Sequence, residues 1–203
     1  GGGALLGIAA VWGLALAASI TFFARASGAH FNPAVSLALA MKNGRSATPL
    51  GLPSSKWLAP YMVAQVAGAA LGSWLVYFFF SSNFAHMPRA TRPPAMGCYP
   101  GAGFGVQKVF AAEFLGTTLL ALGAVLLPSG WHIGGWLSAL IMVFATISGA
   151  SFNPARELGP RAVCWMMGFD LQKVVLASLS VYLVAQFAGA VVGVYLGGVF
   201  KRG

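Results

Sequence analysis

The sequence is poor in charged residues, and above all in acidic ones. Only 7% of its 203 residues are charged and 3 are acidic, whereas a soluble domain carries about 25% charged residues. A soluble helical bundle needs polar faces, and these segments have almost none. Two cysteines, Cys98 and Cys164, are too few and too far apart for a disulfide framework or a metal site. We therefore expect a membrane protein without a metal or other cofactor.

Long apolar stretches are what the sequence has in place of charge. A bilayer core of ~30 Å requires about 20 apolar residues of helix. The stretches do not alternate polar and apolar residues, which excludes a β-barrel. Glu113 is the only Asp, Glu, Lys or Arg inside any of them, and they span residues 4–24, 57–80, 109–127, 131–155 and 174–200. This pattern predicts an all-α, multi-pass membrane protein.

The remaining charge is strongly positive. Twelve Lys and Arg residues against 3 acidic ones give a net charge of +9. Most of these cations lie between or beside the apolar stretches, where lipid headgroups are the expected partners. No basic array interleaved with aromatic residues accompanies them, so we expect no nucleic-acid partner. No P-loop, HExxH motif or nucleophile–base spacing occurs, so we expect no enzyme.

One segment of the sequence occurs twice. Residues 27–37 read SGAHFNPAVSL and residues 148–158 read SGASFNPAREL, with eight of eleven positions identical. YMVAQVAGAALG, which begins at Tyr61, returns as YLVAQFAGAVVG at Tyr182, again 121 positions later. Two different segments that both recur after 121 positions indicate a duplicated unit. An odd number of spans per unit would insert the two units in opposite orientations, as in inverted-repeat channels and transporters.

The duplication defines the organisation of the chain. We expect a single transmembrane domain over residues 1–203, with repeat one at 1–80, a loop at 81–107 and repeat two at 108–200. Repeat two has an additional helix from Val109 that carries Glu113. Subtracting the offset of 121 from 113 gives −8, before the first residue. We therefore expect five full spans where the symmetry requires six, with the first span missing.

The triplet Asn-Pro-Ala is a helix start. Asn is a favoured N-cap, and Pro fits the first helical position because the N–H it lacks would have no partner there. The segments that follow, 34–41 and 155–167, are too short to cross a bilayer, so we interpret them as half-helices. Irregular backbone at 27–31 and 148–152 leads into them, and at membrane depth such backbone must line a cavity or be buried. Asn-Pro also starts ordinary turns, but two copies in register favour half-helices.

Two half-helices that meet at their N-termini would place two positive dipole ends at the membrane centre. A cation meets an electrostatic barrier there, while a neutral molecule can accept hydrogen bonds from the side-chain amides of Asn32 and Asn153. With SGAHFNPAV and FNPAREL paired, and Glu113 between them, the chain resembles the aquaporin and glycerol-facilitator family. The resemblance implies six spans plus two half-helices, a pore in each subunit, a homotetramer and, we expect, the plasma membrane. Its pore motifs are Asn32, Pro33, Ala34, Asn153, Pro154 and Ala155.

Arg156 breaks the symmetry of the repeat, because the first copy has Val35 at the matching position. A charge at membrane depth is costly and is by default functional where it lines a water-filled path. Two interpretations are open. Arg156 completes a selectivity filter, as the resemblance implies, or it pairs with backbone carbonyls and only holds the loop. We favour the filter.

The resemblance also implies the other three filter residues. Counting back from the two Asn residues of the motifs places them at Trp12, Ile141 and Ala150. A gap of one or two residues would move Ile141 to Met142 or Val143. An aromatic residue near a membrane interface is otherwise an anchor, which is the alternative for Trp12. A Trp, Ile, Ala and Arg set resembles the wider filters of glycerol-conducting and plant nodulin-like members.

Four residues are expected to support the pore. By resemblance, Glu113 accepts backbone N–H groups of the second motif loop; a proton relay is the alternative, disfavoured because no second acid lies within a span. His30 is expected to orient the first loop. Glu157 and Arg161, an acid after the filter arginine and a base four residues on, are typical of glycerol-conducting members and would form an i,i+4 ion pair.

These interpretations combine into a passive transmembrane channel. We expect it to conduct small neutral solutes, glycerol or other polyols together with water, across a lipid bilayer. The alternative within the same class is a water-selective aquaporin. The alternative from another class is a junctional or scaffold membrane protein with the same fold and a closed pore.

Overall fold

The computed structural model describes residues 2–43, 57–169 and 175–201, and within these ranges the chain is helical without any strand. Five helices in the described part are long and apolar enough to cross a membrane, as expected. They are α1 (Gly2–Ser27), α3 (Leu58–Phe79), α6 (Val106–Leu126), α7 (Gly130–Ser148) and α9 (Val175–Phe200). The two loops expected to follow the half-helices, at 44–56 and 169–173, lie outside the described residues apart from Phe169.

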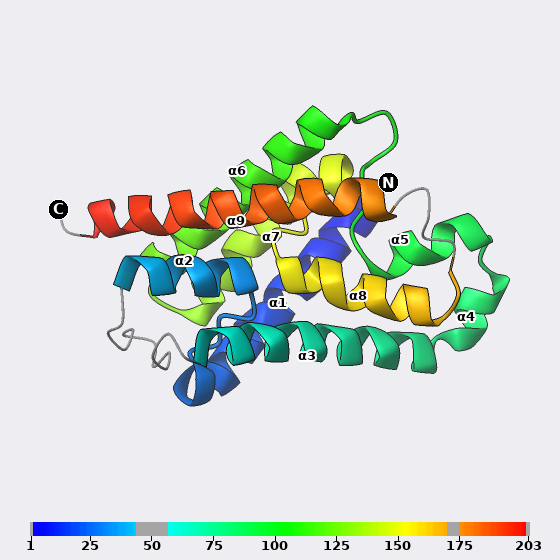
Figure 1. The fold of residues 1–203 in the computed structure, drawn as a ribbon, viewed down its shortest axis with the longest axis horizontal. Coiled ribbons are helices and arrows are strands. Elements are labelled where there is room, and N and C mark those ends of the chain that lie inside the picture. Colours follow the sequence, from blue (N-terminus) through cyan, green and yellow to red (C-terminus); the bar gives the residue numbers. More distant parts are fainter. Residues whose placement is uncertain (1, 44–56, 170–174, 202–203) are drawn as a thin grey trace.

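Two shorter helices begin at the two Asn-Pro-Ala motifs, within a residue of the expected positions. They are α2 (Pro33–Asn43) and α8 (Pro154–Met166), and each has its proline as the first helical residue. In Figure 1 they point toward each other, in one layer between α9 above and α3 below. The sequence thus predicts both half-helices and their meeting point.

The segment between the repeats differs from the loop expected at 81–107. It contains three short helical elements, α4 (Ser81–His86), η2 (Arg89–Thr91) and α5 (Arg92–Met96). Pro93 lies in the first turn of α5, where a proline does not interrupt helical hydrogen bonds. Residues 87–88 and 97–105 stay irregular. We refer to residues 97–105 below as the linker.

Helix pairing follows the repeat. The main contacts join α6 with α9, α1 with α7, α3 with α8 and α2 with α9. The last two pairs are equivalent by symmetry, since each packs a half-helix of one repeat against a long helix of the other. Gly13 and Gly134, 121 positions apart, lie where α1 and α7 are closest, because a Cβ on Gly134 would overlap the carbonyl oxygen of Gly13. The axis that relates the repeats therefore passes through this pair.

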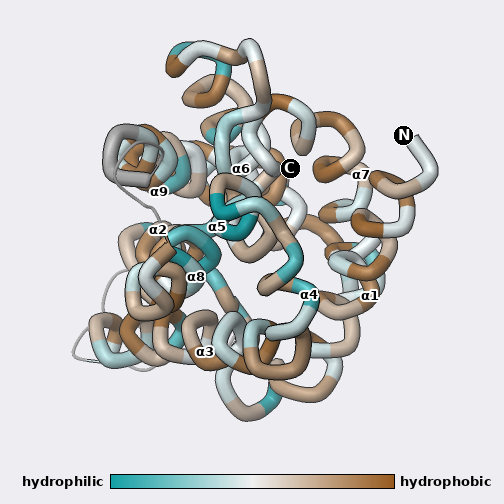
Figure 2. Tube along the Cα trace, turned by 90° about the vertical axis from the view of Figure 1, so that its right-hand side faces the viewer, coloured by the Kyte–Doolittle hydropathy of each residue, from teal (hydrophilic) through white to brown (hydrophobic). Residues whose placement is uncertain are grey.

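The exterior of the long helices is apolar. Figure 2 shows hydrophobic segments around α1, α3, α7 and α9, while hydrophilic segments gather around α5 and α8. Large exposed apolar side chains include Val11, Phe22, Val63, Phe79 and Val199. Such a surface suits lipid or a neighbouring apolar helix rather than water.

The small-residue faces of α3 and α9 are equivalent in sequence but not in packing. On α9, a Cβ added at Gly189 or Gly193 would overlap the carbonyl oxygen of Phe114 or Thr118, so the backbones of α9 and α6 are in close contact. The equivalent Gly68 and Gly72 on α3 have nothing within 4 Å among the described residues. On α3 the same segment packs closely against α8 through Ala69 and Ala70 instead, because a Cβ added at Gly159 would overlap both residues.

Candidate functional site

Two irregular loops at the centre of the molecule carry the site. Loop one (residues 28–32) leads into α2, and loop two (residues 149–153) leads into α8. Their backbones match residue for residue, with φ of 48° at Ala29 and 49° at Phe31, and 51° at Ala150 and 55° at Phe152. These are left-handed conformations that non-glycine residues adopt at a cost of about 1–3 kcal/mol each, and they cluster at functional sites.

The two motif asparagines cap their own half-helices, as expected. Asn32 Oδ1 accepts from Ala34 N at 3.0 Å, and Asn153 Oδ1 accepts from Ala155 N at 2.9 Å. Each cap satisfies a backbone N–H that the helix itself leaves without a partner.

The same asparagines also join the two loops. Asn32 Nδ2 donates to the carbonyl oxygen of Phe152, and Asn153 Nδ2 donates to that of Phe31, both at 2.7 Å. An amide group has two N–H donors, so each cross-loop bond uses one of them and the other can serve a permeating molecule. The sequence interpretation treated the amides as donors to solute and did not include this structural bond.

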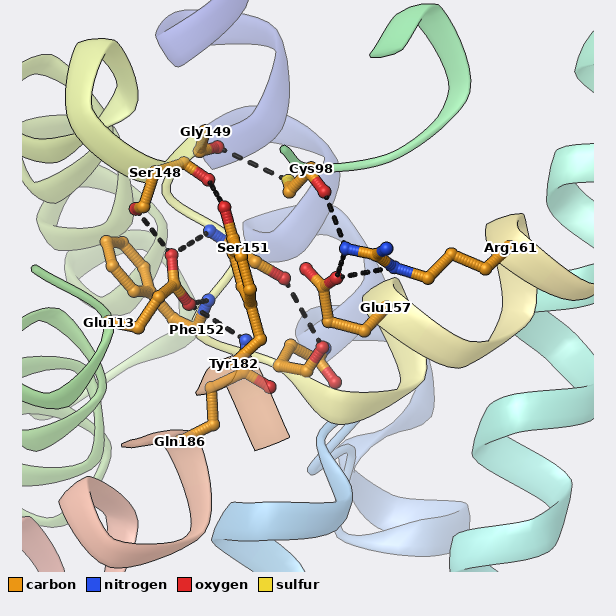
Figure 3. Close-up of polar contacts among 11 residues, drawn as sticks. Cys98, Glu113, Ser148, Gly149, Ser151, Phe152, Glu157, Arg161, Tyr182 and Gln186 are labelled. Carbon is orange, nitrogen blue, oxygen red and sulfur yellow. Dashed lines mark hydrogen bonds and ion pairs between the residues drawn. The ribbon is translucent and has the colours of Figure 1, made fainter. Parts of the chain in front are cut away.

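A buried carboxylate supports loop two. Glu113 on α6 is completely buried and accepts four hydrogen bonds, shown in Figure 3. Two come from the backbone, Ser151 N at 3.0 Å and Phe152 N at 2.8 Å, as the resemblance implied. The others come from Ser148 Oγ at 2.6 Å and Gln186 Nε2 at 2.8 Å. Four donors compensate for much of the cost of burying the carboxylate.

Loop one is supported by a hydroxyl group. Tyr61 on α3 donates to the carbonyl oxygen of Ser27 at 3.0 Å and accepts from His30 N at 3.2 Å. His30 Nδ1 lies 3.1 Å from Ser36 Oγ, which also accepts from Gln65 Nε2 at 2.9 Å. Among the described residues no carboxylate reaches loop one. The position of His30 agrees with its expected orienting role, which stays a prediction.

Arg156 extends from the first turn of α8 back along loop two. Its Nη1 donates to the carbonyl oxygen of Ala150 at 2.6 Å. Its guanidinium carbon lies 4.2 Å from the centre of the Trp12 ring, a close cation–π contact with α1. Two of the expected filter residues, Ala150 and Trp12, therefore touch Arg156, and their role as a filter stays a prediction.

Ile141, on α7, packs in the same apolar cluster as Ala150 of loop two. It is buried there, and the cluster also includes Phe152. Met142 and Val143, the alternatives by count, are 40% and 61% exposed. Of the three positions considered on α7, Ile141, obtained by counting without a gap, is therefore the one that is buried beside loop two.

Glu157 and Arg161 form the expected i,i+4 ion pair on α8. Arg161 Nη2 lies 2.7 Å from Glu157 Oε2, with side chains that are 4% and 0% exposed. Glu157 is thus a second acid buried near Glu113, with Ser151 adjacent to both. The structure therefore corrects the expectation that no second acid lies near Glu113. The relay stays disfavoured because Arg161 holds Glu157 as its counter-ion.

Several residues of the site were not singled out from the sequence. They are Ser148, Ser151, Tyr182, Gln186 and Cys98. Tyr182 and Gln186 lie in the repeated YxVAQ segment, so the repeat itself could have identified them. Nothing in the sequence pointed to Cys98. Within the described residues no three His, Cys, Asp or Glu side chains gather as metal ligands.

The fold and the loops agree with comparisons to known proteins. The family model of the major intrinsic proteins matches residues 2–200. The chain belongs to this family. Members of the family are passive membrane channels rather than enzymes, and the chain is accordingly an integral, multi-pass membrane protein.

Relatives of this major intrinsic protein fall into more than one group. It is 32% identical to rice "Aquaporin NIP1-1" over 93% of this chain and 60% of that protein. It is 33% identical to "Probable aquaporin AqpM" of Archaeoglobus fulgidus, covering 93% of this chain and 74% of the relative. It is 29% identical to the "Glycerol uptake facilitator protein" of Escherichia coli K12, covering 80% of this chain and 63% of the relative. The chain thus spans about three fifths of the rice protein.

The solved structure of the aquaglyceroporin from Plasmodium falciparum has the same fold. The TM-score is 0.75, over 98% of this chain and 82% of that one, at 21% sequence identity. An identity this low supports the fold alone. The predicted all-α, aquaporin-like membrane fold is confirmed.

Proposed function

We propose that this protein is a passive channel for small neutral solutes, glycerol or another polyol together with water. The observation that carries the proposal is the contact of Arg156 with Ala150 and Trp12 at the N-terminal end of α8. A guanidinium group and loop carbonyls form a polar side, while Trp12 and Ile141 form an apolar side. A polyol has hydroxyl groups along one edge and C–H groups along the other, so it matches both sides.

The composition of this site favours a polyol over water alone. At the positions of Ile141 and Ala150, narrow water-selective members of the resembled family carry His and Cys. Isoleucine and alanine remove a hydrogen-bonding group and leave an apolar surface. Pore width and the hydrogen-bonding groups that line the pore are what set selectivity in such channels.

The two half-helix N-termini account for the exclusion of cations. Their positive dipole ends meet where Asn32 and Asn153 join the loops. Protons and metal cations are repelled there, while a neutral solute can accept the second N–H of each amide. We further propose a homotetramer in the plasma membrane, supported by the large apolar exterior of α1 and α7.

A swelling assay on proteoliposomes tests the proposal. The full chain is reconstituted, and light scattering follows the response to osmotic steps of glycerol and of an impermeant sugar. Flux of both water and glycerol supports the polyol channel. Water flux alone would replace it with a water-selective aquaporin, and no flux of either would favour the closed-pore scaffold.

A further inference from the structure

The Glu157–Arg161 ion pair also fastens the linker to α8. Arg161 Nε and Nη2 donate to Glu157 Oε2 at 2.9 Å and 2.7 Å. Nη2 also donates to the carbonyl oxygen of Cys98 in the linker, at 3.0 Å. Both charged side chains are buried, and they contact each other, the linker and Tyr182 rather than Ala150 or Trp12. Any influence of the pair on selection must therefore act through other residues.

Aromatic rings fix the position of the guanidinium. The guanidinium carbon of Arg161 lies 4.7 Å from the ring centre of Tyr99 and 5.7 Å from that of Tyr182. Tyr182 in turn donates its hydroxyl to the carbonyl oxygen of Ser148, at 2.6 Å. Arginine suits such a site because its planar, forked group can stack and donate in several directions at once.

Cys98 continues the chain of contacts into loop two. Its Sγ donates to the carbonyl oxygen of Gly149 at 3.4 Å, as shown in Figure 3. Burial raises the pKa of the Cys98 thiol to about 12, so the thiol keeps the proton that it donates. Close by, Gly101 N donates to the carbonyl oxygen of Ile147 at 2.9 Å. The linker is therefore attached to loop two at Gly149 and to the end of α7 at Ile147.

Gly149 immediately precedes Ala150, whose carbonyl oxygen accepts the hydrogen bond of Arg156. We propose that Arg161 is a positioning residue for solute selection, because through Cys98 it holds the loop-two backbone that orients Arg156. This inference rests on the proposed channel function. Repeat one has Ala40 at the position that matches Arg161, so the arrangement belongs to repeat two alone.

The test uses the full chain in proteoliposomes and compares ratios of fluxes. Arg161→Lys keeps a positive charge for Glu157, but a lysine cannot reproduce the forked contact with Cys98. We expect the permeability to a five-carbon polyol relative to glycerol, and proton leak relative to water flux, to rise about threefold or more, as for the loss of one hydrogen bond. A loss of folded channels would lower all fluxes by one factor and leave both ratios unchanged.

A second variant keeps the inference testable if Arg161→Lys does not fold. Glu157→Leu combined with Arg161→Met replaces the buried pair by apolar residues of similar size, a change that is often neutral for stability. It should alter both ratios in the same direction. Lys108→Gln is the matched control, because it removes an exposed cation beside the linker, and it should leave the ratios at their wild-type values.

The outcomes separate the inference from the function on which it rests. Unchanged ratios in both Arg161 variants, with a conducting wild type, would overturn the positioning role and leave the channel intact. A wild type that conducts water but not glycerol would overturn the polyol proposal, and the ratio of proton leak to water flux would then decide the inference. A wild type that conducts nothing would overturn both.

Discussion

The two motif loops have nearly the same sequence and the same backbone, yet different neighbours support them. Loop two is held by the Glu113 carboxylate, which accepts two backbone N–H groups directly. Loop one is held by the Tyr61 hydroxyl, which bonds one carbonyl group and one N–H. Arg156 lies beside loop two, whereas the matching residue beside loop one is the buried Val35.

This difference shows how one duplicated unit can serve two purposes. The shared Asn-Pro-Ala start sets the capping and the cross-loop bonds in both copies, and these depend only on local residues. The surrounding helices decide how firmly each loop is held and which of them carries a charge. We therefore expect changes at the carboxylate, the arginine and the packed glycines of repeat two to have larger effects than the compared changes in repeat one, and the two tyrosines to show the reverse order.

The largest effect is expected at the carboxylate. Glu113→Gln replaces an acceptor oxygen by an NH₂ group that faces N–H or O–H donors, so at least one buried donor loses its partner. We expect a loss of about 3 kcal/mol in unfolding free energy, the upper range for hydrogen bonds to charged groups, and a severe loss of flux. Thermal unfolding in detergent and proteoliposome swelling measure the two effects.

The comparison variant in repeat one is Gln65→Leu. Gln65 matches Gln186 by symmetry and donates to Ser36 Oγ, so its loss should cost about 1 kcal/mol. Equal losses of stability at Glu113 and Gln65 would contradict the view that the two loops differ in support.

The next effect concerns the small-residue faces. Gly189→Val would place side-chain atoms against the backbone of α6 at Phe114, and such overpacking costs typically about 1–3 kcal/mol. Gly68→Val is the matched change on α3, where nothing lies within 4 Å among the described residues. Unfolding temperatures of the two variants should therefore differ, with Gly68→Val near the wild type. A similar drop in both would mean that the α3 face is covered in the functional assembly.

The third effect is on selectivity. Arg156→Ala removes the charge and the hydrogen bond to Ala150, so protons and five-carbon polyols should leak through. An increase of about tenfold corresponds to roughly 1.4 kcal/mol of barrier. Val35→Ala is the matched change beside loop one and should have no such effect. Flux ratios that stay at the wild-type value in Arg156→Ala would show that the residue only holds the loop.

Features that depend on short-range sequence could be predicted. The starts of α2 and α8 follow from Asn and Pro at the first turn, and the Glu157–Arg161 pair follows from spacing of four residues on one helix. The bond of Glu113 with loop two came from resemblance, since no local pattern joins residues so far apart in the chain. In these cases either the helix geometry or a known family supplied the contact.

Features that depend on tertiary packing could not be predicted from the sequence. The cross-loop bonds of Asn32 and Asn153 require both loops to be placed within hydrogen-bonding distance. The attachment of the linker through Cys98 depends on a segment with no repeat partner, expected to be loop and found to follow three short helical elements. The different surroundings of Gly68 and Gly189 also cannot be read from two segments that match so closely.

The last comparison tests the tyrosine hydroxyl groups that bond the two loops. Tyr61→Phe removes both the donation to Ser27 and the acceptance from His30 N, so it should cost about 1–3 kcal/mol at about 0.5–1.5 kcal/mol for each bond. Tyr182→Phe removes the bond to Ser148, but Glu113 still holds that loop, so we expect about 1 kcal/mol or less. Unfolding temperatures and water flux measured on both variants give the order. A larger loss for Tyr182→Phe would mean that loop two depends on its tyrosine more than on its carboxylate. The order expected here would instead show that loop one depends more on Tyr61 than loop two depends on Tyr182.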